Sequence, residues 1–272
     1  MTEPRFRRSQ NGRRERGKRA GVMLALSCAI VTLSALPLGA QLTVDRLEIF
    51  STPSATARVM SSFVVRNTGK EPAQATVTRE DWSRQENGEN QFAPSGSTPG
   101  SCRDRINVFP VSFRIEPGAT QVVRIPVEAA GSTAKECWEI VMVQELPRKS
   151  ESSKSSLQYI FRTGVKVYVT PDSLRKDASI AGMTFDKKNV TIRFANDGQV
   201  HLAAKGRIEF RNLDNSVAVQ ASIPEFAILP GAVRRLDVAI PAGLRPGQYI
   251  ALALIDFGGS EIAAGQLEMS TR

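Results

Sequence analysis

The sequence predicts an all-β protein with two immunoglobulin-like β-sandwich domains after an N-terminal signal sequence. From Gln41 onward, short runs with apolar residues at alternate positions are separated by Gly, Pro and Asn. This alternation is typical of strands, and no stretch has the apolar period of a helix. A weak internal repeat then divides the mature chain, about 230 residues long, into two parts of the size of one sandwich each.

The first 40 residues have the order of a secretory signal. A basic run, Arg5–Arg19, precedes an uncharged apolar stretch, Ala20–Leu38, and small residues follow up to Ala40. We expect cleavage near Ala40 and an exported mature protein. The basic region is long for a signal peptide, so an uncleaved anchor in the inner membrane is the alternative.

The net charge of +9 is concentrated in this signal. Removal of its eight basic and two acidic side chains lowers the net charge of the remainder to +3. No later cluster of Lys and Arg is interleaved with aromatic residues, as a nucleic-acid groove would require. The positive charge therefore indicates export, and we expect no nucleic-acid partner.

Two cysteines follow the signal, Cys102 and Cys137. In an exported chain a single pair is most simply a disulfide, and closing this loop would contribute roughly 4 kcal/mol. The alternative is two unpaired thiols. The one histidine, His201, lies far from both in sequence and there is no CxxC spacing, so neither a metal site nor a cofactor is expected.

The repeat that divides the chain is a shared order of turns. In each half an apolar strand runs into an Asn-x-Gly turn, at residues 67–69 and 196–198, and a Pro-Gly turn follows, at 117–118 and 230–231. Asn and Gly supply the positive-φ positions that sharp turns need. The two turns lie further apart in the first half, and we assign the additional residues to a polar loop, Gln85–Arg105.

The domain boundaries follow from the strands and the linker. We place the signal at residues 1–40, the first sandwich at 41–171 and the second at 172–272, with Pro171 ending the last ladder of the first. The second sandwich has a similar number of strands from about Ser179 onward. The strands predicted for the first are Leu42–Phe50, Val59–Asn67, Ala73–Trp82, Val108–Ile115, Gln121–Val127, Trp138–Leu146 and Leu157–Thr170.

The last of these strands is unusually long. Strands average about five or six residues, so part of this one is expected to project beyond its sheet, carrying Leu157, Tyr159 and Phe161 on the apolar face. Lys166 falls on the polar face. The alternative interpretation is an ordinary last strand whose apolar face lies in the core.

The first domain resembles the PapD-like periplasmic chaperones of pilus assembly. The resemblance rests on the order of Phe109-Pro-Val-Ser-Phe-Arg-Ile-Glu-Pro-Gly118, Gln121-Val-Val-Arg-Ile125, Glu145-Leu-Pro147 and the long strand up to Pro171. It covers Leu42 to Pro171, and the second domain only by position and type. It implies a periplasmic chaperone that lends a strand to pilus or fimbrial subunits lacking their own last strand, with an outer-membrane usher as a further partner.

The same resemblance implies a site. Leu157, Tyr159 and Phe161 would be the donated side chains, and Lys166 the cleft lysine that binds the carboxylate at the end of the subunit. The alternative for Lys166 is a solvated lysine on the polar face.

The family's second cation, an arginine late in the first strand, is missing. Leu47 or Glu48 lies at about its place, and Arg46 is the nearest basic residue, so Arg46 is the candidate for this role. If Arg46 does not point into the cleft, the anchoring of a carboxylate is weakened.

No constellation for catalysis is present, so we expect neither an enzyme nor a small-molecule substrate. His201 is interpreted as an exposed neighbour of a turn.

The competing function is a non-catalytic two-sandwich envelope protein with a structural, adhesive or other assembly role, because sandwiches host many functions. The polar composition of Arg148–Ser156, directly before the long strand, predicts a flexible loop that would permit strand donation.

Overall fold

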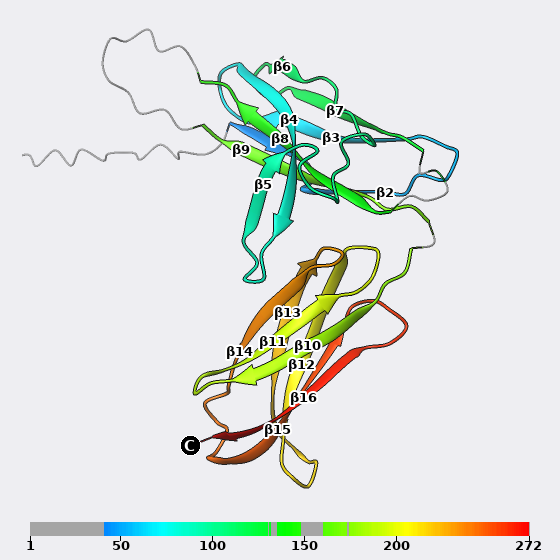
Figure 1. The fold of residues 1–272 in the computed structure, drawn as a ribbon. Coiled ribbons are helices and arrows are strands. Elements are labelled where there is room, and N and C mark those ends of the chain that lie inside the picture. The colour runs from blue at the N-terminus through cyan, green and yellow to red at the C-terminus, as the bar shows by residue number, and fades with distance from the viewer. Residues whose placement is uncertain (1–40, 130, 132–134, 148–159, 173, 272) are drawn as a thin grey trace, which may run out of the picture. The chain divides into compact units, whose positions relative to one another are not determined.

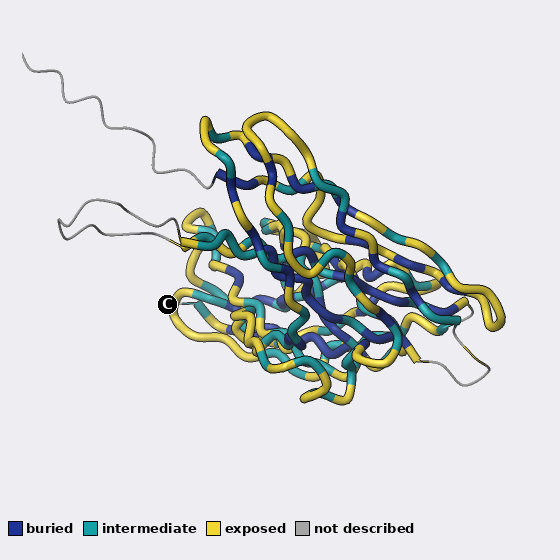
Figure 2. Tube along the Cα trace, turned by 90° about the horizontal axis from the view of Figure 1, so that it is seen from above, coloured by how far each residue is buried: buried dark blue, intermediate teal, exposed yellow. Residues whose placement is uncertain are grey.

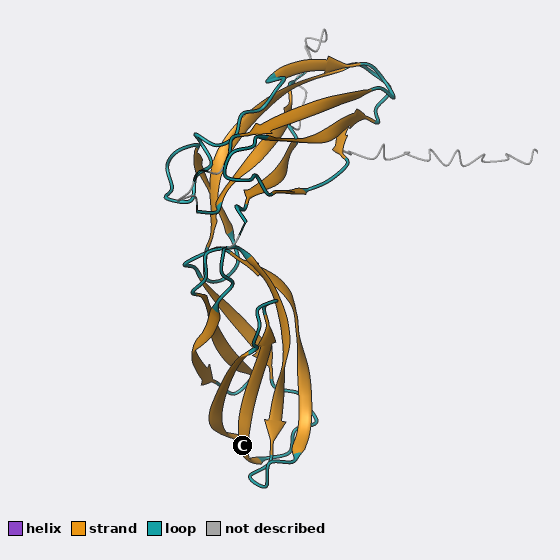
Figure 3. Cartoon of the chain, turned by 90° about the vertical axis from the view of Figure 1, so that its right-hand side faces the viewer, coloured by secondary structure: helices purple, strands orange, loops and turns teal. Residues whose placement is uncertain are grey.

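A computed structural model describes residues 41–129, 131, 135–147, 160–172 and 174–271 (Figure 1). These residues form β-strands and loops without any helix (Figure 3), as the sequence predicts. Among them there is accordingly no helix of the length and apolarity that would cross a membrane. The predicted signal at residues 1–40, the polar stretch Arg148–Ser156, and Leu157 and Tyr159 lie outside the described residues.

Nine strands of the described chain build the first sandwich. One sheet has the order β1-β3-β7; the other has the order β2-β9-β8-β4-β5, and β6 also pairs with β4. Every pairing is antiparallel except that of β2 with β9. The strands are β1 Leu42–Val44, β2 Glu48–Ser51, β3 Val59–Asn67, β4 Ala73–Arg84, β5 Asn90–Pro94, β6 Ser112–Ile115, β7 Thr120–Val127, β8 Cys137–Glu145 and β9 Arg162–Val169.

Alternating side chains from both sheets form the core of this sandwich. Figure 2 shows buried and exposed positions alternating along the strands. Phe63 and Val65 of β3 meet Val141 of β8 and Val167 of β9, all fully buried. Burying each such side chain contributes about 1.5–3 kcal/mol.

The first predicted strand, Leu42–Phe50, is in fact two strands in different sheets. β1 pairs with β3, and β2 pairs with β9. The switch occurs at Asp45, whose carboxylate accepts the N–H of Val64 at 2.8 Å and thereby replaces the next backbone acceptor of the ladder. Leu42 and Ile49 still point into the same core, which is why the sequence reads as one run.

The predicted polar loop, Gln85–Arg105, was also wrong in part. β4 extends to Arg84 and forms a hairpin with β5, Asn90–Pro94, in which Trp82 lies opposite Phe92. β5 is an edge strand of largely exposed residues, so it lacks the apolar alternation that indicates a strand.

The predicted strand Val108–Ile115 is shorter in the structure, where β6 begins at Ser112. Phe109 makes only an isolated bridge with Arg124. Pro110 has no N–H with which to continue a ladder. The long last strand likewise begins at Arg162, and Ile160 and Phe161 precede it.

Seven strands of the described chain form the second sandwich. Its sheets have the orders β10-β11-β14 and β13-β12-β15-β16. β9 ends at Val169 and β10 begins at Ala178, while the exact boundary at residue 171 stays a prediction. The strands are β10 Ala178–Phe185, β11 Asn189–Asn196, β12 Leu202–Arg211, β13 Val217–Ile228, β14 Val233–Ala239, β15 Gly247–Asp256 and β16 Ala263–Thr271.

The sequence repeat corresponds to a repeated hydrogen-bond motif at the end of β3 and of β11. Asn67 is fully buried, and its side-chain amide donates to the carbonyl of Ile115 at 3.0 Å. Asn196 is equally buried and donates to the carbonyl of Ile228 at 3.2 Å. Each asparagine therefore ties the end of its strand to the end of another strand.

Glycine is required at the turns of the repeat for two different reasons. Gly118 and Gly231 lie at φ of 74° and 72°, in the left-handed region that the Pro-Gly turns require. Gly69 and Gly198 do not have positive φ, contrary to the expectation for the Asn-x-Gly turns. At Gly198 the reason is space, because a Cβ would lie 2.6 Å from the backbone nitrogen of Asp177.

Candidate functional site

The candidate site is an open strand edge in the first sandwich. β8 pairs with the whole of β9, from Arg162 to Val169. On the other side of β9, β2 pairs only with Lys166 to Val169. The first half of β9, Arg162–Val165, therefore has an edge with which no strand of the described chain pairs.

The backbone groups at this edge can be assigned from the ladder. The carbonyl of Phe161 accepts the N–H of Glu145 on the β8 side, and the N–H of Lys166 is donated to Leu47 on the β2 side. Because successive residues of a strand point their backbone groups to opposite sides, Arg162 and Gly164 direct theirs to the open edge. Such unpaired groups are a template for another strand.

The side chains of β9 separate into two faces as the alternation predicts. Val165, Val167 and Val169 belong to the core. Phe161 is half-buried at the start of the strand, and the preceding Ile160 is 51% exposed. Of the three predicted donor residues, Phe161 alone falls within the described part of the chain.

Lys166 lies where the paired edge of β9 ends and the open edge begins. Its register partner is Glu48, the first residue of β2, and its Nζ contacts Glu48 Oε1 at 2.8 Å. The same Nζ lies 5.4 Å from the centroid of the Trp82 ring. The lysine side chain is only 22% exposed, so this cation is partly withdrawn from water.

Arg46 has a different partner. Its guanidinium contacts the carboxylate of Asp45 at 2.9 Å, and its side chain is 55% exposed. Arg46 and Glu48 line one surface hollow of about 470 Å³ beside β2. The structure thus gives the two predicted anchor residues, Lys166 and Arg46, separate acidic partners.

Exposed apolar side chains lie in β2 and beside it. Leu47 and Phe50 are 60% and 59% exposed, and Met60 of β3 is 62% exposed. Phe50 also stacks on Tyr168 of β9, with 5.3 Å between ring centroids. Sequence reasoning missed this patch, because the switch at Asp45 reverses which residues of the run face outward.

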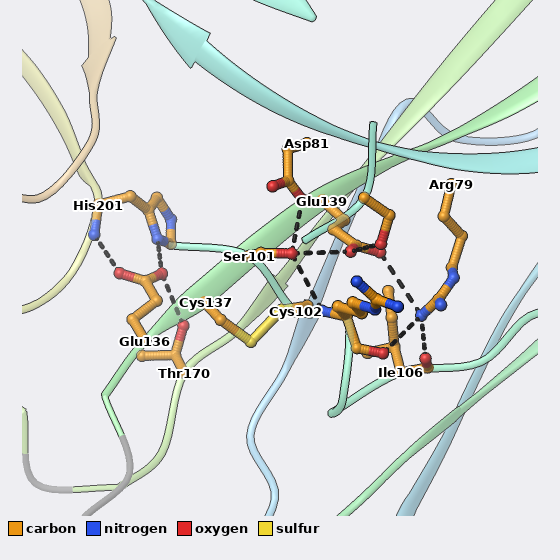
Figure 4. Close-up of a disulfide and its surroundings, with 12 residues drawn as sticks. Arg79, Asp81, Ser101, Cys102, Ile106, Glu136, Cys137, Glu139, Thr170 and His201 are labelled. Carbon is orange, nitrogen blue, oxygen red and sulfur yellow. Dashed lines mark hydrogen bonds and ion pairs between the residues drawn. A yellow bond between two sulfur atoms is a disulfide. The ribbon is translucent and has the colours of Figure 1, made fainter. Parts of the chain in front are cut away.

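A disulfide lies on the β8 side of β9 (Figure 4). Cys102 is joined to Cys137, the first residue of β8, as the sequence predicts. Next to it, the backbone N–H of Trp138 is donated to the carbonyl of Gly100 at 2.9 Å. This hydrogen bond and the disulfide attach the segment around residue 100 to β8, the strand that pairs with β9.

Two carboxylates are buried beside the disulfide, on neighbouring strands (Figure 4). Asp81 of β4 accepts hydrogen bonds from the Thr98 N–H at 2.7 Å and the Ser101 hydroxyl at 2.6 Å. Burial opposes its charged form, but these hydrogen bonds together outweigh burial and lower the pKa of Asp81.

Glu139 of β8 has weaker support. It accepts a hydrogen bond from the Ser95 hydroxyl at 2.5 Å, and Arg79 Nη1 lies 3.7 Å from its other oxygen. Here burial outweighs both interactions and raises the pKa of the Glu139 carboxyl.

His201 is not the exposed turn residue that the sequence predicts. Its ring stacks on Tyr168 with 4.1 Å between centroids, and its Nδ1 contacts the buried carboxylate of Glu136, which also accepts the Thr170 hydroxyl at 3.0 Å (Figure 4). Within the described part of the chain, no three His, Cys, Asp or Glu side chains are grouped to hold a metal ion.

Comparison with solved structures gives the same two-sandwich fold. The crystal structure of the class 5 fimbriae chaperone CfaA matches with a TM-score of 0.50 and 13% identity, covering 85% of this chain and 99% of that one. A chain of the structure described as "Chaperone-tip adhesin complex is vital for synergistic activation of CFA/I fimbriae biogenesis" matches with a TM-score of 0.51 and 14% identity, with the same coverage. Comparison with curated protein sequences finds no match.

Comparison with protein families identifies the first sandwich. Residues 52–175 match the family described as the pili and flagellar-assembly chaperone, PapD N-terminal domain. This range includes the whole of β9 and begins directly after β2, which ends at Ser51. The family is one of assembly chaperones, which supports the prediction of a non-enzyme at the level of the family. The first sandwich is therefore similar to the N-terminal domain of the PapD-like pilus assembly chaperones.

Proposed function

We propose that this protein is a periplasmic chaperone that binds exported pilus or fimbrial subunits by donating the start of β9 to them. The family and the fold support the role in assembly. The observation that carries the mechanism is the open edge at Arg162–Val165, which pairs only with β8 among the strands that the structure describes.

Strand donation would satisfy both partners. A strand of the bound subunit, the client, would pair with the backbone groups of Arg162 and Gly164. Leu157, Tyr159 and Phe161 would fill the apolar groove that the client's missing strand leaves, each contributing about 1.5–3 kcal/mol on burial. The client's own open edge would be covered and so protected from aggregation.

Lys166 is the proposed anchor for a carboxylate of the client. A lysine that is partly withdrawn from water beside Trp82 interacts more strongly with a carboxylate than an exposed one would. Arg46 is the proposed auxiliary cation, and it would have to leave Asp45 in order to contribute.

The proposed location is supported by the signal predicted at residues 1–40 and by the family match of the first sandwich. The disulfide between Cys102 and Cys137 suits an oxidising compartment such as the periplasm. An outer-membrane usher that receives the loaded client is the proposed second partner.

The test is recovery of clients from the native periplasm with a tagged mature protein, followed by mass spectrometry. Wild type should retain small exported β-rich proteins, and Phe161→Arg should lose them while both sandwiches stay folded. Phe185→Arg is the control, because Phe185 is an exposed aromatic at the end of β10. Identical or empty eluates from wild type and Phe161→Arg would instead favour the envelope-structural role.

A further inference from the structure

We propose that Glu48 is a built-in competitor for the carboxylate anchor, which holds Lys166 in the free chaperone and gives way when a client carboxylate arrives. This inference rests on the proposed function and adds a regulation of the same site. It makes Glu48 the residue that sets how strongly a client's carboxylate is selected.

The position of the ion pair carries the first step. Glu48 and Lys166 are the first register pair of the β2–β9 ladder, directly beyond the open edge at Arg162–Val165. A client strand added to that edge would occupy the line of β2 and end next to this pair. The pair is therefore the part of the protein that the end of a bound strand would meet.

The exposure of the two partners carries the second step. The Glu48 side chain is 42% exposed, whereas that of Lys166 is 22% exposed and lies against Trp82. Glu48 can return to water at little cost, but Lys166 would lose its counter-charge in a partly dry place. A second carboxylate can then take the place of the first without moving the lysine.

The neighbouring charges carry the third step. Arg162 contacts Glu80, and Arg46 contacts Asp45, so each of these two arginines already has an acidic partner of its own. A carboxylate that approaches Lys166 therefore meets Glu48 as its direct competitor. A neutral strand end meets no such competition.

Neutralising Glu48 should therefore strengthen the binding of a carboxylate at Lys166. Glu48→Gln keeps the shape of the side chain but removes the charge that Lys166 now contacts. Carboxylate binding at Lys166 should become about fivefold tighter, the factor expected for loss of one exposed ion pair. Glu48→Thr, with a residue that favours strands, is the second variant if the first does not fold.

The experiment uses acetate as the probe and NMR of the Lys166 side chain as the readout. The ¹Hε–¹³Cε signal, assigned by comparison with Lys166→Arg, is followed during titration with sodium acetate in the mature protein. We expect a saturating shift at lower acetate concentration in Glu48→Gln than in wild type, and none with acetamide. Glu80→Gln, which frees Arg162 instead, is the matched control and should behave as wild type.

Equal responses of wild type and Glu48→Gln, or no response in either, would overturn the competitor role. The titration needs no client, so its failure leaves strand donation to be judged by the periplasmic recovery. An empty recovery, in turn, would remove the proposed function but would leave the exchange at Lys166 measurable.

Discussion

At the scale of single residues, Asp81 and Glu139 show how neighbouring buried acids can acquire opposite properties. Both lie beside the disulfide, and Ser101 contacts both. The Ser101 hydroxyl has one proton, which the shorter contact of 2.6 Å assigns to Asp81. Glu139 is left with less support, so burial raises its pKa while that of Asp81 is lowered.

We therefore expect the stabilities of Glu139→Gln and Asp81→Asn, relative to wild type, to change with pH in different ways. Glu139 binds its proton more tightly in the folded state, so its contribution to stability is present at low pH and is lost as pH rises from the unfolded pKa through the raised folded one. Glu139→Gln should therefore gain stability over wild type as pH rises from 4 to 8.

For Asp81 the sign is reversed. Its lowered pKa contributes stability above the unfolded value, and this is lost as pH falls through the folded pKa. Asp81→Asn should be less stable than wild type at pH 7, with a difference that shrinks in acid. Thermal unfolding of both variants across this pH range is the measurement, and a pH-independent loss in both would refute the assignment.

At the scale of elements, the repeated asparagine sets where strands end. The Asn196 amide also donates to the carbonyl of Val200 at 2.8 Å, so one side chain satisfies two buried acceptors. Backbone carbonyls buried without a partner are costly, which gives this side chain a role that no apolar residue can take.

Asn196→Ala should destabilise the protein by about 1–3 kcal/mol for each carbonyl left unpaired. Urea denaturation at equilibrium, with a constant m-value, measures the change. Asn90→Ala is the control, because Asn90 contacts Arg84 in an exposed bond and its loss should cost less than about 0.5 kcal/mol. Equal losses in the two variants would contradict a special role for Asn196.

The strands that could be predicted from the sequence are those with one buried face. β3 matches its prediction, Val59–Asn67, and β7 begins one residue before the predicted Gln121–Val127, because both alternate cleanly between core and solvent. The switch at Asp45 could not be predicted, since it depends on a hydrogen bond to Val64 that only the folded chain brings into reach.

Alternation also predicted part of the candidate site. Alternation placed Phe161 and Lys166 on opposite faces of the last strand, as the structure has them. The contact of Lys166 with Glu48 depends on a parallel pairing between segments far apart in sequence, which alternation cannot reveal. The hairpin strand β5 was missed for a related reason, because polar edge strands lack a periodic signal.

At the scale of the whole molecule, the proposed function depends on one sheet edge in the first of the two sandwiches. The described part of β9 is long enough to pair with β8 throughout, but β2 covers only its second half. Donating the uncovered half would leave the ladder with β8, and hence the core, intact. The chaperone would therefore bind a client without unfolding any part of itself.

The most direct test of this claim is amide hydrogen exchange at single residues of β9, measured by NMR in the free protein and in the complex with a client recovered from the periplasm. In the free protein Arg162 and Gly164 should exchange faster than Thr163 and Val165, whose amides face β8. In the complex Arg162 and Gly164 should become protected. Slow exchange at both residues in the free monomer, or unchanged exchange in the complex, would contradict strand donation at this edge.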